Sequence, residues 1–228
     1  MLKDRLESVL ERIQAAATGS GRDPSAVRLV AVSKTVPAEK VIEAVEAGVE
    51  TLGENYVQEA RTKIEALAAL PVAWHYIGHL QSNKAKYVVK LFDLIHSVDS
   101  FKLARELNKQ AAKVGKVQPI LIQVNIAEES TKSGVSEQDT INLIESVRPL
   151  NNLAVKGLMT MPPYFNAPDK VRPFFAALRN LRDRIEGLNL ENVAMDELSM
   201  GMTGDFEVAI AEGATLVRVG TAIFGERT

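Results

Sequence analysis

Cysteine is missing altogether from the 228-residue chain, which excludes disulfide bonds, thiolate metal sites and cysteine nucleophiles and is compatible with a reducing compartment. Neither sign of charge dominates, since 27 basic and 29 acidic side chains leave a net charge of -2. The composition therefore gives no indication of nucleic acid or anionic membrane as a partner. No run of about 18 apolar residues is present, which argues against a membrane span. Together these absences predict a soluble, cytoplasmic protein that binds a small molecule.

The length and apolar content predict one domain over residues 1–228. With 46% hydrophobic residues, the chain can bury one sizeable core. Near the N-terminus, apolar residues recur at helical spacing among charged ones, unlike a secretory signal: Leu2, Leu6, Val9, Leu10 and Ile13. Gly19 and Gly21 end this pattern. Residues 1–20 are therefore expected to contain an amphipathic helix that precedes the main architecture.

Short apolar runs alternate with helical patterns along the rest of the chain. Strands are predicted at 29–32, 51–53, 73–77, 94–98, 119–124, 153–159, 193–198 and 216–219. Helices are predicted at 38–47, 57–67, 83–90, 101–114, 137–147, 169–185 and 205–211. Eight units of roughly 25 residues without a linker favour an α/β fold, a closed (β/α)8 TIM barrel. An open doubly wound sheet is the alternative, because periodicity does not give strand order.

The first predicted strand places a lysine at its carboxyl end. Ser33 and Lys34 directly follow the apolar run 29–32. Active-site groups of barrels gather in the loops after the strands. Partial shielding from water at the barrel mouth would free the nucleophilic lone pair that Schiff-base chemistry requires. The alternative is a lysine whose stem packs at the strand end while its amine reaches solvent.

Small and hydroxyl-bearing residues follow the last two predicted strands. They are Ser199, Gly201, Thr203 and Gly204 after the seventh, and Gly220 and Thr221 after the eighth. Phosphate sites of barrels often use these two loops, where small residues expose backbone N–H groups and hydroxyls donate hydrogen bonds. The pattern predicts a phosphate site. Ordinary turn glycines and helix capping by Thr203 are the alternative.

Six segments of the chain resemble one known family. The segments are VAVSK (30–34), GENY (53–56), WHYIGHLQSNK (74–84), GLMTM (157–161), LSMGM (198–202) and VRVGTAIFG (217–225). They are similar to the pyridoxal phosphate homeostasis proteins, which are related to the barrel domain of alanine racemase, a fold type III architecture. The resemblance covers nearly the whole chain.

The resemblance implies pyridoxal 5'-phosphate (PLP) as the cofactor, bound covalently as an aldimine on Lys34. It implies that Ser199, Gly220 and Thr221 hold the phosphate, beside Gly201 and Thr203. Arg218 would face the pyridine nitrogen. A guanidinium does not readily surrender a proton, so it would leave that nitrogen unprotonated and weaken the ring as an electron sink. A salt bridge to a carboxylate at the barrel mouth is the other interpretation of Arg218.

Two further residues are expected near the cofactor. Asn55 follows the second strand, and its alternative role is a helix cap. Met159 ends the sixth strand, where it would pack on the cofactor ring, and its alternative role is to fill the core. No metal site is expected, because His75 and His79 straddle a strand and its loop rather than one helix face. The basic stretch Lys84, Lys86 and Lys90, with Tyr87, is interpreted as a solvated helix face. 

The sequence favours a protein that holds or delivers PLP over an enzyme. Alanine racemases carry a further β domain after the barrel that supplies a second acid/base group, whereas this chain ends at Thr228. We therefore expect poor racemisation, a monomer, and a role in PLP (vitamin B6) homeostasis and amino- and keto-acid balance, with apo-enzymes as recipients of PLP. The alternatives are a low-activity PLP-dependent racemase or lyase, and an interaction module that reports B6 status.

Overall fold

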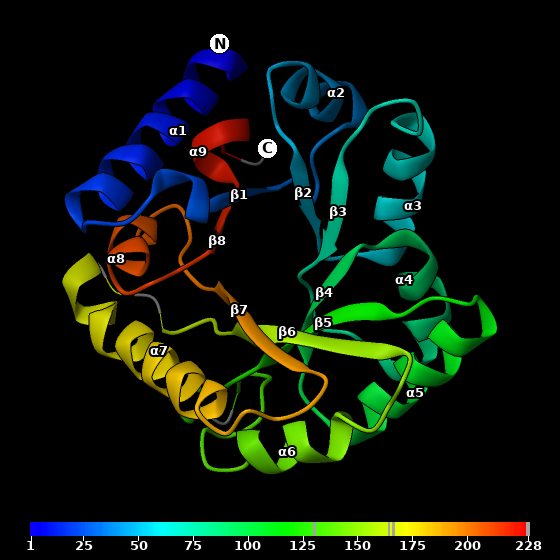
Figure 1. Ribbon diagram of the computed structural model, residues 1–228. Helices are drawn as coiled ribbons and strands as arrows, with labels where there is room; N and C mark the ends of the chain where they lie inside the picture. Colours follow the sequence, from blue (N-terminus) through cyan, green and yellow to red (C-terminus); the bar gives the residue numbers. More distant parts are fainter. Residues whose placement is uncertain (130, 164, 166, 227–228) are drawn as a thin grey trace.

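Eight parallel strands close into a barrel in the computed structural model, which describes residues 1–129, 131–163, 165 and 167–226 (Figure 1). Thr228, the end of the chain, lies outside these residues. The strands are β1 (Arg28–Val32), β2 (Thr51–Glu54), β3 (Ala73–Tyr76), β4 (Leu94–Val98), β5 (Gln118–Gln123), β6 (Leu153–Met159), β7 (Val193–Ser199) and β8 (Leu216–Val219). They follow one another around the barrel, and β8 pairs with β1. The predicted (β/α)8 barrel is confirmed, and the open sheet is wrong.

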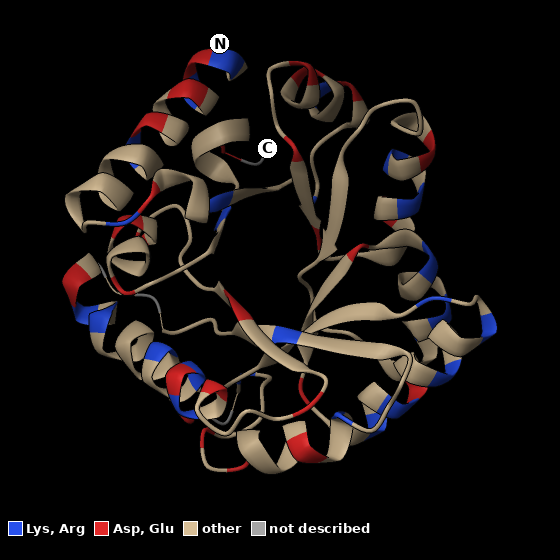
Figure 2. Ribbon diagram, viewed as in Figure 1, with Lys and Arg blue, Asp and Glu red and all other residues tan. Residues whose placement is uncertain are grey.

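Helices surround the barrel on its outer face (Figure 1). They are α1 (Leu2–Gly19), α2 (Ala38–Glu46), α3 (Val57–Ala66), α4 (Ala85–Leu91), α5 (Phe101–Lys113), α6 (Thr140–Val147), α7 (Arg172–Glu186), α8 (Phe206–Ala211) and α9 (Thr221–Phe224). Both signs of charge occur on α1 and on α7 (Figure 2). Within the described residues, none of these helices combines the length and the apolar character that a membrane crossing requires.

Helices α6 and α7 each begin three residues later than their sequence patterns predict. Helix α6 begins at Thr140 rather than at residue 137, because Ser136 forms a turn first: its Oγ accepts from the Asp139 N–H and its carbonyl accepts from the Thr140 hydroxyl. Helix α7 begins at Arg172 rather than at residue 169, after the 3₁₀ turn Pro168–Val171. Both helices end within one residue of their predicted ends.

Helix α1 packs beside α8 and α9, the last helices of the chain (Figure 1). Its apolar face is buried through Leu2, Leu6, Val9, Ile13 and Ala17. On its polar side, the Arg12 guanidinium lies 4.6 Å from the centroid of the Phe206 ring and forms an ion pair with Glu207. The predicted N-terminal helix is therefore confirmed, and it covers the seam between the first and last βα units.

Apolar residues pack in two places. The larger cluster lies between the strands and the helices. A smaller one comes from five of the strands and fills part of the barrel interior: Val30, Leu94, Leu121, Met159 and Leu216. The strand irregularity between β6 and β7 is fixed by Gly157, whose φ is +150° and whose added Cβ would collide with the carbonyl oxygen of Glu197. This close approach sets how β7 delivers its last residues to the barrel mouth.

Candidate functional site

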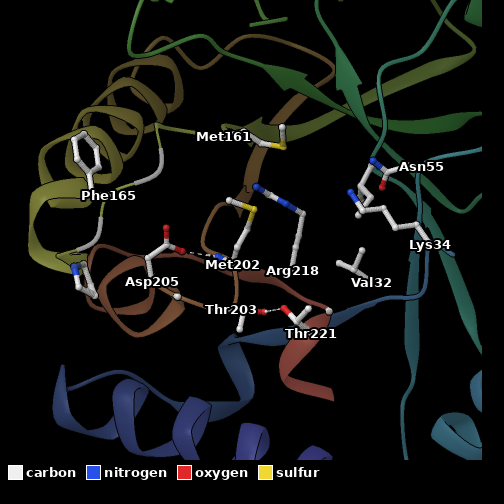
Figure 3. Close-up of a pocket in the computed structure, with 14 residues that line it drawn as sticks. Val32, Lys34, Asn55, Met161, Phe165, Met202, Thr203, Asp205, Arg218 and Thr221 are labelled. Atoms are coloured by element: carbon white, nitrogen blue, oxygen red, sulfur yellow. Dashed lines mark hydrogen bonds between the residues drawn. The ribbon is translucent and has the colours of Figure 1, made fainter. Parts of the chain in front are cut away.

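A cavity of about 390 Å³ lies at the carboxyl ends of the strands, where barrel active sites form (Figure 3). Its lining comes from the ends of β1, β2, β3 and β8 and from the loops after β6 and β7. Of the predicted site residues, it contains Lys34, Asn55, Thr203, Arg218, Gly220 and Thr221. Folding therefore brings residues nearly 190 positions apart, from 34 to 221, into one cavity.

Lys34 and Asn55 lie together on one side of this cavity, and Thr203 and Thr221 lie together below Arg218 in the view of Figure 3. Lys34 is half-buried in the turn that follows β1. The Oδ1 atom of Asn55 is buried and accepts no hydrogen bond from the described residues. The Lys34 amine, a group that can form an imine with an aldehyde, thus lies on the same side of the cavity as the Asn55 amide oxygen.

The part of the cavity around Thr203 and Thr221 is rich in hydroxyls and small residues. The Thr221 hydroxyl donates to the Thr203 hydroxyl over 3.3 Å, although the two residues are 18 positions apart. Gly204 and Gly220 lie beside them, and a Cβ added to Gly204 would meet no atom within 4 Å. This end offers hydroxyl donors and accessible backbone to a small anion.

Arg218 forms the buried cationic part of the cavity. It is only 3% exposed, and its guanidinium donates to Ser199 Oγ over 2.5 Å and to the carbonyl of Thr160 over 2.8 Å. Among the described residues, no carboxylate oxygen lies within 4.0 Å of its nitrogens, which disfavours the salt-bridge interpretation. Burial lowers the pKa of Arg218 to about 10, and the charge of Asp205 opposes this shift. The guanidinium therefore stays charged at neutral pH.

A chain of buried polar groups continues from Arg218 into the barrel interior. Ser199 Oγ lies 2.9 Å from His96 Nδ1, and His96 Nε2 lies 3.0 Å from His75 Nδ1. Strands β4 and β7 are not neighbours, so the bond between His96 and Ser199 crosses the barrel. Burial lowers the pKa of His75 to about 3 and the pKa of His96 well below its usual range. Both imidazoles are neutral at physiological pH.

The side chain of Ser199 faces the barrel interior. It is fully buried and does not line the cavity, and its hydroxyl is engaged by Arg218 and His96. In this position Ser199 orients the guanidinium of Arg218, and its expected contact with a phosphate stays a prediction.

Gly201 and Met159 also lie away from the main cavity. Gly201 has a φ of +91°, and a Cβ there would be 2.6 Å from the Cβ of Ala209, so the glycine lets α8 pack closely. Met159 is 1% exposed within the barrel-interior cluster and lines a smaller neighbouring cavity of about 230 Å³. The smaller cavity shares Asn55, Ile77 and Met161 with the main one, and the expected packing of Met159 on a cofactor ring stays a prediction.

The remaining lining residues were not singled out from the sequence. They are Val32, Ile77, Met161, Phe165, Pro168, Met202 and Asp205, whereas Gly204, which also lines the cavity, was expected to allow close backbone approach to a phosphate. Met202 and Asp205 lie in the loop already marked by its glycines, and the Met202 N–H donates to Asp205 Oδ1 over 2.6 Å. Burial raises the pKa of Asp205. Phe165 and Pro168 come from the long segment between β6 and α7, which carries no comparable sequence signal.

Sequence relatives match the chain over nearly its full length. It is 50% identical over 224 residues to the pyridoxal phosphate homeostasis protein of Aquifex aeolicus (strain VF5), covering 98% of this chain and 97% of the relative. It is 43% identical over 227 residues to the protein of the same name from Escherichia coli (strain K12), covering 97% of this chain and 95% of the relative. The sequence profile of the alanine racemase N-terminal domain matches residues 4–228.

Solved structures agree with this pattern. PipY of Synechococcus elongatus PCC7942, solved with PLP bound, is 36% identical with a TM-score of 0.85, and the match covers 99% of this chain and 100% of that one. An alanine racemase of Clostridium difficile 630 is 15% identical with a TM-score of 0.70, covering 98% of this chain and 57% of that one. At this low identity, the second likeness concerns the fold alone.

Proposed function

The chain belongs to the alanine racemase N-terminal domain family, and within it to the pyridoxal phosphate homeostasis proteins, and from this premise we propose that it binds PLP in the cavity at the barrel mouth. PipY, which binds PLP, is 36% identical over nearly the whole chain. The observation that carries the proposal is the convergence of Lys34, Arg218 and the Thr203–Thr221 pair on one cavity.

The chemistry of these residues fits a phosphorylated pyridine aldehyde. A primary amine suits the aldehyde, and hydroxyls and accessible backbone suit the phosphate. A buried guanidinium that forms no ion pair with any described carboxylate suits a neutral ring nitrogen. When bound, PLP supplies an aldehyde that condenses with amines and a ring that withdraws electrons. We assign its covalent attachment, as a Schiff base, to Lys34.

Thr203, Gly220 and Thr221 hold the phosphate in this proposal, and Arg218 faces the pyridine nitrogen. Ser199 and Thr160 fix the guanidinium by accepting two of its N–H groups. Because Arg218 stays charged at neutral pH, it donates a hydrogen bond without transferring a proton. The ring nitrogen therefore remains unprotonated, and the cofactor is a weak electron sink.

A weak electron sink favours holding and delivering PLP over rapid turnover of amino acids. We propose that the protein serves intracellular PLP homeostasis and amino- and keto-acid balance, with apo-enzymes as recipients. A cytoplasmic location and a monomeric state belong to the same proposal. A recipient enzyme would take the cofactor by exchange of its own lysine for Lys34.

An absorbance spectrum of the purified protein with PLP tests covalent attachment. The wild-type chain is expected to show the long-wavelength band of a PLP–lysine Schiff base, and Lys34→Ala is expected to lack it while keeping its circular dichroism. Lys40→Ala, which removes an exposed lysine of α2, is the matched control and should keep the band. Retention of the band in Lys34→Ala would overturn the assignment.

A further inference from the structure

Behind the turn that carries Lys34 lies a buried group of ions, here called the Lys63 cluster (Glu54, Glu59 and Lys63). Lys63 is 4% exposed, and its Nζ atom lies 2.7 Å from Glu54 Oε1 and 2.6 Å from Glu59 Oε1. Glu54 is fully buried, and its Oε2 atom has no hydrogen-bond partner among the described residues. The cluster lies between the outer side of β2 and helix α3, outside the cavity.

The Lys63 cluster contacts the residues on both sides of Lys34. On one side, Ser33 Oγ donates to Glu54 Oε1 over 2.7 Å, and Lys63 Nζ donates to the carbonyl of Ser33 over 2.5 Å. On the other, the Thr35 N–H donates to Glu59 Oε1 over 2.5 Å. These bonds engage both neighbours of Lys34, whose own side chain lines the cavity.

The backbone at this turn needs such support. Thr35 has a φ of +63°, in the left-handed region that β-branched residues rarely adopt. A residue held there persists only when its surroundings impose the conformation. Among the described residues, the Thr35 N–H donates to Glu59 from outside the turn, whereas the Thr35 hydroxyl donates to the adjacent carbonyl of Lys34. The bond to Glu59 therefore helps to impose this conformation.

Packing alone does not explain a buried group of ions at this position. Removing three charged groups from water carries a desolvation penalty, and apolar residues of similar volume often replace buried ion pairs without loss of stability. Apolar side chains would not, however, give Ser33 and Thr35 hydrogen-bond partners of fixed direction. What the Lys63 cluster supplies beyond stability is therefore the geometry of the turn.

We propose that Glu54, Glu59 and Lys63 are positioning residues that hold the Ser33–Thr35 turn so that the Lys34 amine faces the aldehyde of a ligand in the cavity. The inference rests on the proposed function. It assigns to residues outside the cavity a specific effect on covalent attachment, separate from the affinity for the phosphate and the ring.

The test compares two ligands and a graded set of variants. PLP reports attachment to Lys34 through the rate of appearance of its absorbance band, whereas pyridoxine 5'-phosphate has no aldehyde and reports non-covalent binding alone. Glu59→Ala removes the acceptor of the Thr35 N–H, and Glu59→Gln retains an acceptor oxygen. Lys63→Met removes the ammonium but keeps an unbranched stem. Glu65→Ala, which removes an exposed carboxylate of α3, is the matched control.

We expect attachment of PLP to slow at least tenfold in Glu59→Ala and Lys63→Met, while the Kd for pyridoxine 5'-phosphate stays within twofold of wild type. Glu59→Gln and Glu65→Ala should attach PLP at close to the wild-type rate. Wild-type attachment in Glu59→Ala, or equal losses for both ligands, would overturn the inference. If Lys63→Met does not fold, the Glu59 pair decides, since Glu59 is partly exposed.

Amide hydrogen exchange gives a readout that needs no cofactor. In the ligand-free protein, the Thr35 amide should exchange at least tenfold faster in Glu59→Ala than in Glu59→Gln, because only the second keeps the acceptor. Equal exchange in the two variants would contradict the inference. If the wild-type protein attaches no PLP, the proposed function fails, and the exchange measurement still decides whether the cluster holds the turn.

Discussion

Ser199→Ala separates the two roles that a serine at the end of β7 can have. The hydroxyl joins the Arg218 guanidinium, at 2.5 Å, to His96 Nδ1, at 2.9 Å, and the side chain is fully buried. Alanine removes this oxygen, so the Arg218 guanidinium and the His96 imidazole each lose a hydrogen-bond partner at a fully buried position. Each of the two buried groups that loses its partner costs about 1–3 kcal/mol, so the free energy of unfolding should fall by about 2–6 kcal/mol.

For a chain of this length, 1 kcal/mol changes the melting temperature by about 2–4 °C, so Ser199→Ala should melt about 4–24 °C lower. Urea and thermal unfolding of the PLP-free protein measure both quantities. Thr221→Val is the matched variant, because Thr221 lines the cavity and its hydroxyl bonds only to that of Thr203 among the described residues. It should lose PLP affinity with little loss of stability. An unchanged melting temperature in Ser199→Ala, together with a tenfold or larger loss of PLP affinity, would refute this reasoning. It would indicate instead that Ser199 contacts the phosphate.

Three further predictions concern pH, ring chemistry and backbone fit. Because burial lowers the pKa of His75 from 6.5 to about 3, the unfolded chain binds a proton between these values that the folded chain does not. Stability should therefore fall as the pH drops below about 6.5, by about 1.4 kcal/mol per pH unit for this histidine. His75→Gln should flatten the slope of urea unfolding against pH by that amount, and an identical slope would count against a neutral His75. Arg218→Glu should permit protonation of the pyridine nitrogen and raise the rate of half-transamination even if PLP affinity falls. An unchanged rate in the folded, PLP-loaded variant would refute the role assigned to Arg218. Gly157→Ala should lower the free energy of unfolding by about 1–3 kcal/mol, because the added Cβ meets the Glu197 carbonyl and the φ of +150° disfavours alanine; wild-type stability in urea would contradict it.

The strands and helices could be predicted because their signal is local. Apolar runs such as 29–32 and 119–124 mark strands, and their alternation with helical patterns indicates βα units, although it does not give the order of the strands. The first residues of α6 and α7 could not be predicted, because turns at Ser136 and Pro168 compete with the helix there.

The cavity was predictable only in part. Position after a strand end made Lys34 and Thr221 candidates, since carboxyl ends of parallel strands share one face of a barrel. The family resemblance then supplied their expected roles. Contacts across the barrel, such as the one between His96 and Ser199, depend on the stagger of strands that are not neighbours. Sequence periodicity gives no stagger, so it did not reveal the histidine chain beneath Arg218.

The identity of the lysine that carries PLP tests the central claim most directly. The protein is loaded with PLP, reduced with borohydride so that any Schiff base becomes a stable secondary amine, and digested for mass spectrometry. We predict a phosphopyridoxyl group on the peptide that contains Lys34, and its loss from that peptide in Lys34→Ala. Labelling confined to another lysine, or no labelling of a folded and PLP-saturated protein, would contradict the account.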